Sequence, residues 1–286
     1  IRCGDVSGKL CLFLNNDNGL ELSNMQSVQI WGSEFDNFGG NPSGTGVWGT
    51  NVDNLYLKNC TMNKQEKGVL IVDRTNLSMQ SGIIQNGEIG ILASGSNGEP
   101  LGNANIDLTA GATIQNNYCG IFVDPFNYQS AQVLPMLTLD CANILNNMIG
   151  IRGRNFLMNM DAGGEVASNE FSTSSANSYS INVQVCYDNK IDIDEVEATH
   201  NYWANNSQNK RRIWKMGGGT CTYIDPLDDL PAPNLGTGNI PLETSPELPT
   251  PPEGCSSPND PGTPTGEQPS APHPSMPDFN IKVNGC

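Results

Sequence analysis

A short pattern of alternating aliphatic and polar residues recurs at least seven times along the chain and constrains the fold more than any other feature. Typical copies are "NLYLKNCTM", "NIDLTAGAT" and "MLTLDCANI". Every copy contains two aliphatic or Met residues separated by one other residue. The second member of each pair is Ile30, Leu57, Met79, Leu108, Leu139, Met160 and Ile193. The first member is Val28, Leu55, Leu77, Ile106, Leu137, Met158 and Ile191.

Successive copies are 21 to 33 residues apart, which indicates a repeat protein whose units are built from strands. Period-two alternation places the aliphatic side chains on one face of each strand. Strands stacked about 4.8 Å apart then form parallel sheets around a continuous apolar interior. A residue that is nearly always small follows each pair at a fixed distance, where we expect a sharp corner. These residues are Ser33, Cys60, Gly82, Gly111, Ala142, Gly163 and Val196.

A second strand is expected after each corner, because a glycine followed by apolar residues recurs there. These glycines are Gly46, Gly68, Gly90, Gly120 and Gly150. Asparagines near the end of the repeats are expected to adopt a left-handed backbone conformation and to hydrogen-bond to the next repeat. They are Asn86, Asn116, Asn146 and Asn201. The longer repeats carry extra residues, which we expect to form loops on one edge, at 94–103 and 124–135.

These repeats resemble those of secreted right-handed parallel β-helix proteins of bacteria. The segment "EATHNYWANNSQ", followed by "TYIDPL", is similar to the Asn-Tyr-Trp motif and the Tyr-x-x-Pro-Leu strand that end many such domains. The family usually has Gly where this chain has Ala204. The resemblance implies an all-β fold, a right-handed parallel β-helix (solenoid) of about seven to eight rungs. It implies little about activity, because the family includes lyases, hydrolases, epimerases, adhesins and structural surface proteins.

Three regions are expected: an N-terminal cap over 1–18, the parallel β-helix over 19–228, and a Pro-rich extension over 229–286. Fifteen of the 19 prolines lie from Pro226 onward. Such a segment cannot build a core by itself, so we expect it to be pinned by disulfides or to pack in a larger assembly. The chain opens with "IRCGDVSGKL", and we expect it to be a piece of a longer precursor.

Nine cysteines without a CxxC pair favour an oxidising compartment and therefore an extracellular or cell-surface location. The disulfide candidates are Cys3 and Cys11, which would staple the cap, and Cys221, Cys255 and Cys286. Cys60 and Cys141 are expected to be buried thiols. The net charge of -16 argues against nucleic acid and anionic membranes as partners. No apolar run approaches the ~18 residues of a membrane span.

One outward-facing column is predicted to collect acidic residues. It contains the residues that follow the second aliphatic of each repeat: Trp31, Lys58, Gln80, Thr109, Asp140, Asp161 and Asp194. Three stacked carboxylates repel one another, which raises their pKa values unless a cation lies between them. Asp192 and Asp107 lie one column over. A Ca²⁺ ion held by Asp140, Asp161, Asp194 and Asp192 would suit this oxygen cluster. The alternative is a solvated acidic face.

Enzymatic functions remain open as alternatives. A Ca²⁺-dependent polysaccharide lyase would need a base beside the acidic column, for which Arg152, Arg154 and Lys190 are the candidates. A glycoside hydrolase would need two carboxylates about 5 to 9 Å apart, such as Asp140 and Asp161. With only two histidines, a Ser-His-Asp triad is disfavoured.

Three aromatic residues, Trp31, Tyr56 and Trp48, are candidates for stacking on sugar rings; an inward-facing or cap-covered role is the alternative. His200 and Trp203 are expected to close the last repeat. The first hypothesis is an extracellular, non-enzymatic structural or adhesive segment of a larger surface protein, fibre or appendage. Its partners would be other protein chains, including copies of itself. The alternatives are a Ca²⁺-dependent polysaccharide lyase, another carbohydrate-active enzyme, or a carbohydrate-binding module.

Overall fold

The computed structural model describes residues 2–3, 11–38, 41–95, 104–124, 135–154, 156–160, 170–173, 179–186, 196–204, 211–216, 238–240 and 242–243, with isolated residues up to 252. In this part of the chain all regular secondary structure is β-strand. All but one of the strand pairs are parallel, so the expected all-β fold with parallel sheets is confirmed. No helix of these residues is long and apolar enough to cross a membrane.

Sheet A contains 14 of the described strands. They are β1 (Arg2–Cys3), β3 (Asn18–Trp31), β5 (Thr45–Lys58), β7 (Lys67–Val72), β8 (Leu77–Gln80), β10 (Ile89–Ser94), β11 (Asn105–Thr109), β13 (Cys119–Asp124), β14 (Met136–Asp140), β16 (Ile149–Arg154), β17 (Leu157–Asn159), β19 (Tyr179–Cys186), β22 (Arg211–Met216) and β23 (Gly238–Ile240).

Sheet B contains eight of the described strands. They are β2 (Leu12–Leu14), β4 (Glu34–Asp36), β6 (Thr61–Asn63), β9 (Ile83–Gln85), β12 (Thr113–Gln115), β15 (Asn143–Asn147), β18 (Glu170–Thr173) and β21 (Tyr202–Trp203). Two short strands, β20 (Val196–Glu197) and β24 (Leu242–Glu243), form a separate pair.

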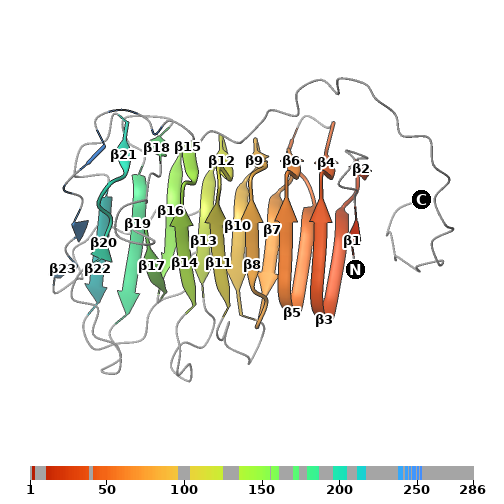
Figure 1. The fold of residues 1–286 in the computed structure, drawn as a ribbon, viewed down its shortest axis with the longest axis horizontal. Helices are drawn as coiled ribbons and strands as arrows, with labels where there is room; N and C mark the ends of the chain where they lie inside the picture. The colour runs from red at the N-terminus through yellow and green to blue at the C-terminus, as the bar shows by residue number, and fades with distance from the viewer. Residues whose placement is uncertain are drawn as a thin grey trace, which may run out of the picture.

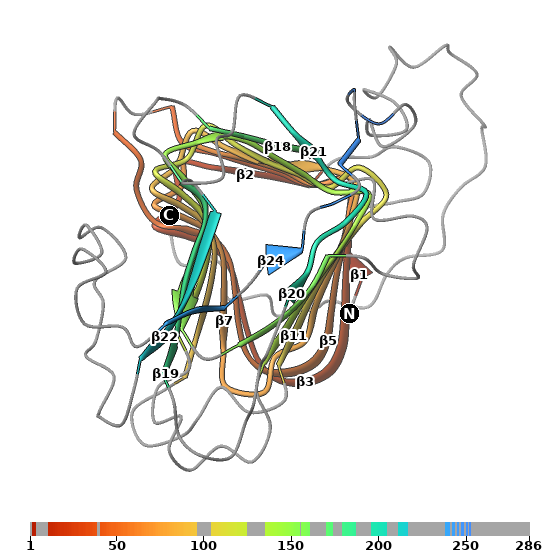
Figure 2. The same cartoon turned by 90° about the vertical axis from the view of Figure 1, so that its left-hand side faces the viewer.

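Sheet A is curled into two arms that share the long strands β3 and β5. The first half of β5 pairs with β7 and its second half pairs with β8. The first arm continues from β8 through β11 and β14 to β17, and the second continues from β7 through β10, β13 and β16 to β19 and β22. The strands stand side by side along the molecule (Figure 1). In the end-on view, sheet B lies across the open side of the curl (Figure 2).

The predicted alignment of the repeats is confirmed by the register of the first arm. Leu57 pairs with Met79, Met79 with Leu108, and Leu108 with Leu139. All four side chains are 0% exposed. They form one interior file inside a continuous hydrophobic core, because each strand repeats the period-two pattern of its neighbour.

Three corners explain how short strands can stack without loops between them. At each corner, a residue in successive repeats has a positive φ, which turns the chain sharply, and in two repeats the following residue, Gly82 or Gly111, has a positive φ as well. The three sets are Gly32, Asn59, Ser81, Ala110 and Cys141; Asn15, Lys64, Asn86, Asn116 and Asn146; and Asn24, Asn51 and Asp73. Asn and Asp predominate because their short polar side chains tolerate this conformation better than most residues.

Two details of the predicted corners were wrong. The small-residue position of the fourth repeat is filled by Ala112 rather than Gly111, because this corner contains one extra residue between the two paired strands. In the last repeat, His200 rather than Asn201 has the positive φ of 56°. Asn201 instead is fully buried, and its side-chain amide donates to the carbonyl of Ala198 at 2.8 Å.

The glycine that opens the second-arm strands is required by close backbone contact. A Cβ added at Gly120 would lie 2.5 Å from the carbonyl oxygen of Gly150 and 3.0 Å from Nδ2 of Asn147. The adjacent repeats therefore approach too closely at this column for any side chain.

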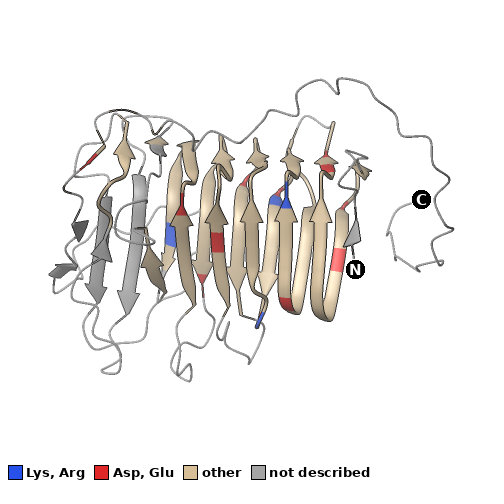
Figure 3. Ribbon diagram, viewed as in Figure 1, with Lys and Arg blue, Asp and Glu red and all other residues tan. Residues whose placement is uncertain are grey.

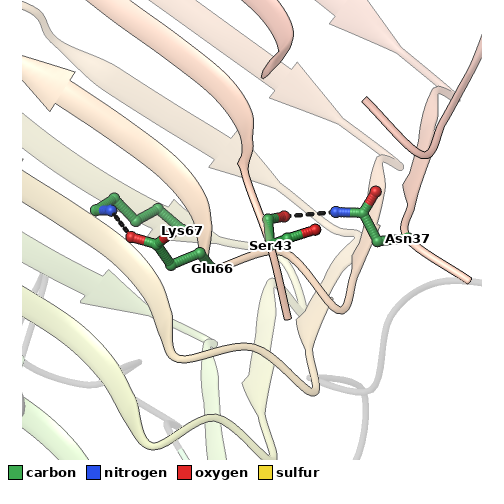
Figure 4. A network of polar contacts seen from close by, with 4 residues as sticks. All are labelled: Asn37, Ser43, Glu66 and Lys67. Atoms are coloured by element: carbon green, nitrogen blue, oxygen red, sulfur yellow. Dashed lines mark hydrogen bonds and ion pairs between the residues drawn. The ribbon is translucent and has the colours of Figure 1, made fainter. Parts of the chain in front are cut away.

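Buried amides join the repeats near the same corner. Nδ2 of Asn117 donates to Oδ1 of Asn147 at 3.1 Å, and Oδ1 of Asn117 accepts from the backbone of Gly87 at 2.9 Å. Nearer the N-terminus, Nδ2 of Asn37 donates to the carbonyl of Ser43, beside the contact between Glu66 and Lys67 (Figure 4). The contacts of Asn37, Asn117 and Asn147 satisfy polar groups that the corners would otherwise leave buried and unpaired.

Several expectations lie outside the described residues. They include residues 96–103 and 125–134 of the predicted loops, Gly163, and the side chain of Val196. Cys221 and most of the Pro-rich extension, including Cys255 and Cys286, also lie outside the described residues.

Candidate functional site

The predicted outward column exists on the first arm as far as the structure describes it. Trp31 pairs with Lys58, Lys58 with Gln80, Gln80 with Thr109, and Thr109 with Asp140. A second outward column lies beside it, in which Tyr56 pairs with Ser78, Ser78 with Asp107, and Asp107 with Thr138. We call these two columns together the first-arm face: Trp31, Tyr56, Lys58, Ser78, Gln80, Asp107, Thr109, Thr138 and Asp140. All nine side chains are partly exposed.

Tyr56 is held along this face by a hydrogen bond to the next strand. Its hydroxyl donates to Oε1 of Gln80. Burial raises the pKa of the Tyr56 hydroxyl, so it remains a hydrogen-bond donor at neutral pH. Trp31 lies on β3 in the neighbouring column, one strand away. The sequence prediction missed Gln80 as a partner of Tyr56, although the alignment of the repeats places the two residues on adjacent strands.

Asp107 and Asp140 are diagonal neighbours on β11 and β14, with their Cα atoms about 8 Å apart from the strand spacing and rise. Burial raises the pKa of both carboxyls, and a hydrogen bond from Thr138 opposes this shift at Asp107. The other predicted Ca²⁺ ligands, Asp161, Asp192 and Asp194, lie outside the described residues. Among the residues that are described, no group of three or more His, Cys, Asp or Glu is arranged to hold a metal ion.

Arg152, a candidate lyase base, lies on the second arm, whereas Asp140 lies on the first. Its side chain is 0% exposed, and its guanidinium carbon lies 6.0 Å from the ring centre of Phe122 on the adjacent strand. A guanidinium that is fully buried and packed on an aromatic ring is poorly placed to act as the base of a lyase. The side chain of Arg154 and all of Lys190 lie outside the described part of the chain.

The second arm has an outward column of its own, which the sequence analysis did not anticipate. We call it the second-arm face: Trp48, Leu70, Leu92, Phe122 and Arg152, in register on successive strands. Ile89, Cys119 and Ile149 lie beside it and form a second apolar cluster with Phe122. The sequence does contain a signal for this face: the unbroken apolar runs "GVLIV" and "GIFV" are typical of strands buried on both faces.

The structure therefore separates the three predicted aromatic residues. Trp31 and Tyr56 share the first-arm face, whereas Trp48 belongs to the second-arm face. Trp48 is partly buried, and its indole Nε1 has no hydrogen-bond partner among the described residues. Trp203, predicted to be structural, is 6% exposed and packs in the main core.

The cysteines depart from the expectations in two places. Cys141 is disulfide-bonded, not a buried thiol: it occupies the partly exposed corner position, while Ala142 fills the interior. Cys11 is a thiol, so the predicted staple with Cys3 is not formed. Cys3 pairs with Ile30 in sheet A, whereas Cys11 precedes the first strand of sheet B, across a corner. Cys60 is a buried thiol, as expected, and burial raises its pKa to about 11.

In comparisons with known proteins, no family model, no curated protein and no solved structure matches the chain.

Proposed function

We propose that this chain is a right-handed parallel β-helix that serves as a non-enzymatic structural segment of an extracellular assembly. The observation that carries the proposal is the register of the first arm, in which Leu57, Met79, Leu108 and Leu139 form one buried file. A stack whose strands each bury the same residues against the next is a rigid rod that can be lengthened by repetition. Such a rod suits spacing and load-bearing roles.

The polar side chains on the outside of sheet B support a structural role. Nδ2 of Asn63 donates to Asp36 at 2.8 Å, and Nδ2 of Asn86 donates to Asn63 at 2.8 Å. Nε2 of Gln115 donates to Gln85 at 2.8 Å. These side chains join neighbouring repeats along the stack. Their polar groups therefore stabilise the fold, whereas a binding surface would leave such groups available to a ligand.

The disulfide at Cys141 supports an oxidising, extracellular location, because such bonds persist mainly outside the cytosol. In the view of Figure 3, acidic and basic segments are interspersed along the described strands. With a net charge of -16, the surface is suited to solubility and disfavours nucleic acid as a partner.

The test is a search for enzymatic activity with a matched variant. The purified chain is incubated with acidic and neutral polysaccharides, with and without Ca²⁺, while ultraviolet absorbance reports unsaturated ends and a reducing-sugar assay reports hydrolysis. We expect no product above that of Asp140→Asn. Product that forms with the native chain and is lost in Asp140→Asn would contradict the proposal and favour a carbohydrate-active enzyme.

A carbohydrate-binding role for the first-arm face is the second candidate. The observation that favours it is the fixed position of Tyr56, whose hydroxyl is held by Gln80 beside the Trp31 column. Partly exposed aromatic rings held in place can stack on sugar rings without losing much side-chain entropy. Calorimetric titration with oligosaccharides tests this role. Tyr56→Ala should weaken binding at least about tenfold, whereas Trp48→Ala, on the other arm, should leave it unchanged.

A further inference from the structure

The N-terminal end of sheet B is an unprotected strand edge. β2 is the first strand of that sheet in the described residues, and it pairs only with β4. Leu12 and Leu14 on β2 are 55% and 39% exposed. Phe38, whose backbone amide donates to the side chain of Asn15 just beyond β2, is 63% exposed. Three of the four exposed large apolar side chains of the described residues therefore gather at this end.

The backbone of β2 also faces outward at this edge. The carbonyl of Cys11 accepts from Glu34, and the amide of Asn15 donates to Asp36. In a parallel pair both backbone groups of a residue point to the same side, and this side alternates along the strand. Cys11, Phe13 and Asn15 therefore face β4, and the amides and carbonyls of Leu12 and Leu14 point away from the sheet. Strand edges are usually protected by charges or proline, and β2 has neither.

The sequence of this edge is symmetrical about Phe13, which decides what can pair with it. If a second β2 approaches antiparallel, Leu12 of each copy lies opposite Leu14 of the other, and each pair can exchange two hydrogen bonds. All four leucines then meet on the outer face of the sheet. The two Phe13 rings meet on the inner face, where each ring already stacks on Phe35 at 4.5 Å.

The opposite end of sheet A is built differently. There β23 runs antiparallel to β22, which interrupts the parallel ladder after residue 216. An end-to-tail stack of copies would need a parallel strand at both ends. A molecule with one self-complementary edge and one interrupted end forms a closed pair and not a filament.

We propose that β2, with Leu12, Leu14 and Phe38, is the interface of a two-fold symmetric dimer in which the N-terminal edges of two copies pair antiparallel. The partner is a second copy of this chain. This inference goes beyond the proposed function, since an edge-paired dimer is compatible with either a structural or a carbohydrate-binding role. Each copy carries a net charge of -16, so the dimer should tighten when salt screens their repulsion.

The test is the oligomeric state of the full chain by sedimentation equilibrium at several concentrations. Leu12→Pro removes only an outward-facing amide, a substitution that edge strands tolerate, and Leu14→Lys places a charge on the edge. Met148→Lys is the matched control, because Met148 is as exposed as Leu14, at 39%, but lies between β15 and β16. Circular dichroism and thermal unfolding verify that each variant is folded.

We expect a concentration-dependent dimer for the native chain and for Met148→Lys. Its dissociation constant should rise at least tenfold in both Leu12→Pro and Leu14→Lys. A native chain that remains monomeric at every concentration and salt would overturn the proposal. So would open-ended oligomers, a dimer that survives Leu12→Pro, or an equal loss of association in Met148→Lys.

Discussion

The two arms of sheet A share one interior but have opposite outer faces. The first-arm face is polar and partly exposed, and its side chains bond to one another, as Tyr56 does to Gln80. The second-arm face is apolar from Trp48 to Phe122, and the next residue of its column, Arg152, is 0% exposed beside Phe122. The same repeat therefore builds two kinds of surface. Stacking of the repeats determines which residue types lie inward, whereas the surroundings of each face determine which residue types lie outward.

The largest difference between the arms should appear when a cationic side chain is removed from each. Arg152→Ala removes a large, fully buried side chain from the second arm, together with its contact to Phe122, and should reduce the free energy of unfolding by about 2–4 kcal/mol. Lys58→Ala removes a partly exposed side chain from the first arm and should change it by less than about 0.5 kcal/mol. Denaturant unfolding measures both. Equal effects would mean that the two faces are not distinct.

A smaller effect is expected from the tight glycine column that begins the second-arm strands. In Gly120→Ala the new methyl group would lie 2.5 Å from the carbonyl oxygen of Gly150, so neighbouring repeats must separate. We expect a loss of about 1–3 kcal/mol, by analogy with overpacked cores. Ser78→Ala, on the outward side of the first arm, is the control and should be nearly neutral. Thermal melts of the two variants that coincide would argue against close contact between the repeats.

The sequence predicted the interior and the first-arm face because both follow directly from period-two alternation. Once Met79 and Leu108 are aligned, the residues that follow them, Gln80 and Thr109, must share an outward column. The alignment failed at Gly111, because spacing alone does not reveal which side of a corner holds an extra residue. The burial of Arg152 was not predictable, since an outward arginine has the same local pattern whether or not its face is covered.

A weaker test of the first-arm face uses the hydrogen bond between Tyr56 and Gln80. Tyr56→Phe keeps the ring but removes the hydroxyl, so the free energy of unfolding should fall by about 0.5–1 kcal/mol. The double variant with Gln80→Ala should lose less than the sum of the two single variants, because they share one interaction. Additive losses would show that this bond does not hold Tyr56 in place.

The smallest effect concerns the carboxyls of the same face. Burial raises the pKa of Asp107 and of Asp140, and Thr138 partly opposes the shift at Asp107. A carboxyl whose pKa is higher in the folded state stabilises the fold at low pH, and this contribution is lost as the pH rises through the folded pKa. Asp107→Asn should therefore be slightly more stable than the native chain at neutral pH. The difference should vanish below about pH 3, where carboxyls are protonated in both states.

Thermal unfolding of the two proteins across this pH range, with and without Ca²⁺, measures the effect. A native chain that is the more stable of the two, and only when Ca²⁺ is present, would indicate a bound cation at this face and contradict an unliganded acidic surface.

The most direct test of the account is a disulfide cross-link that reads the register between repeats. Ser78 and Asp107 are paired on adjacent strands, so their Cα atoms lie about 4.8 Å apart, within the range that a disulfide spans. Ser78 and Thr109 are diagonal, with Cα atoms about 8 Å apart, beyond that range. Oxidation followed by peptide mapping should reveal the cross-link in Ser78→Cys/Asp107→Cys and not in Ser78→Cys/Thr109→Cys. The reverse result, or cross-linking in both, would contradict the in-register stacking of like residues over like.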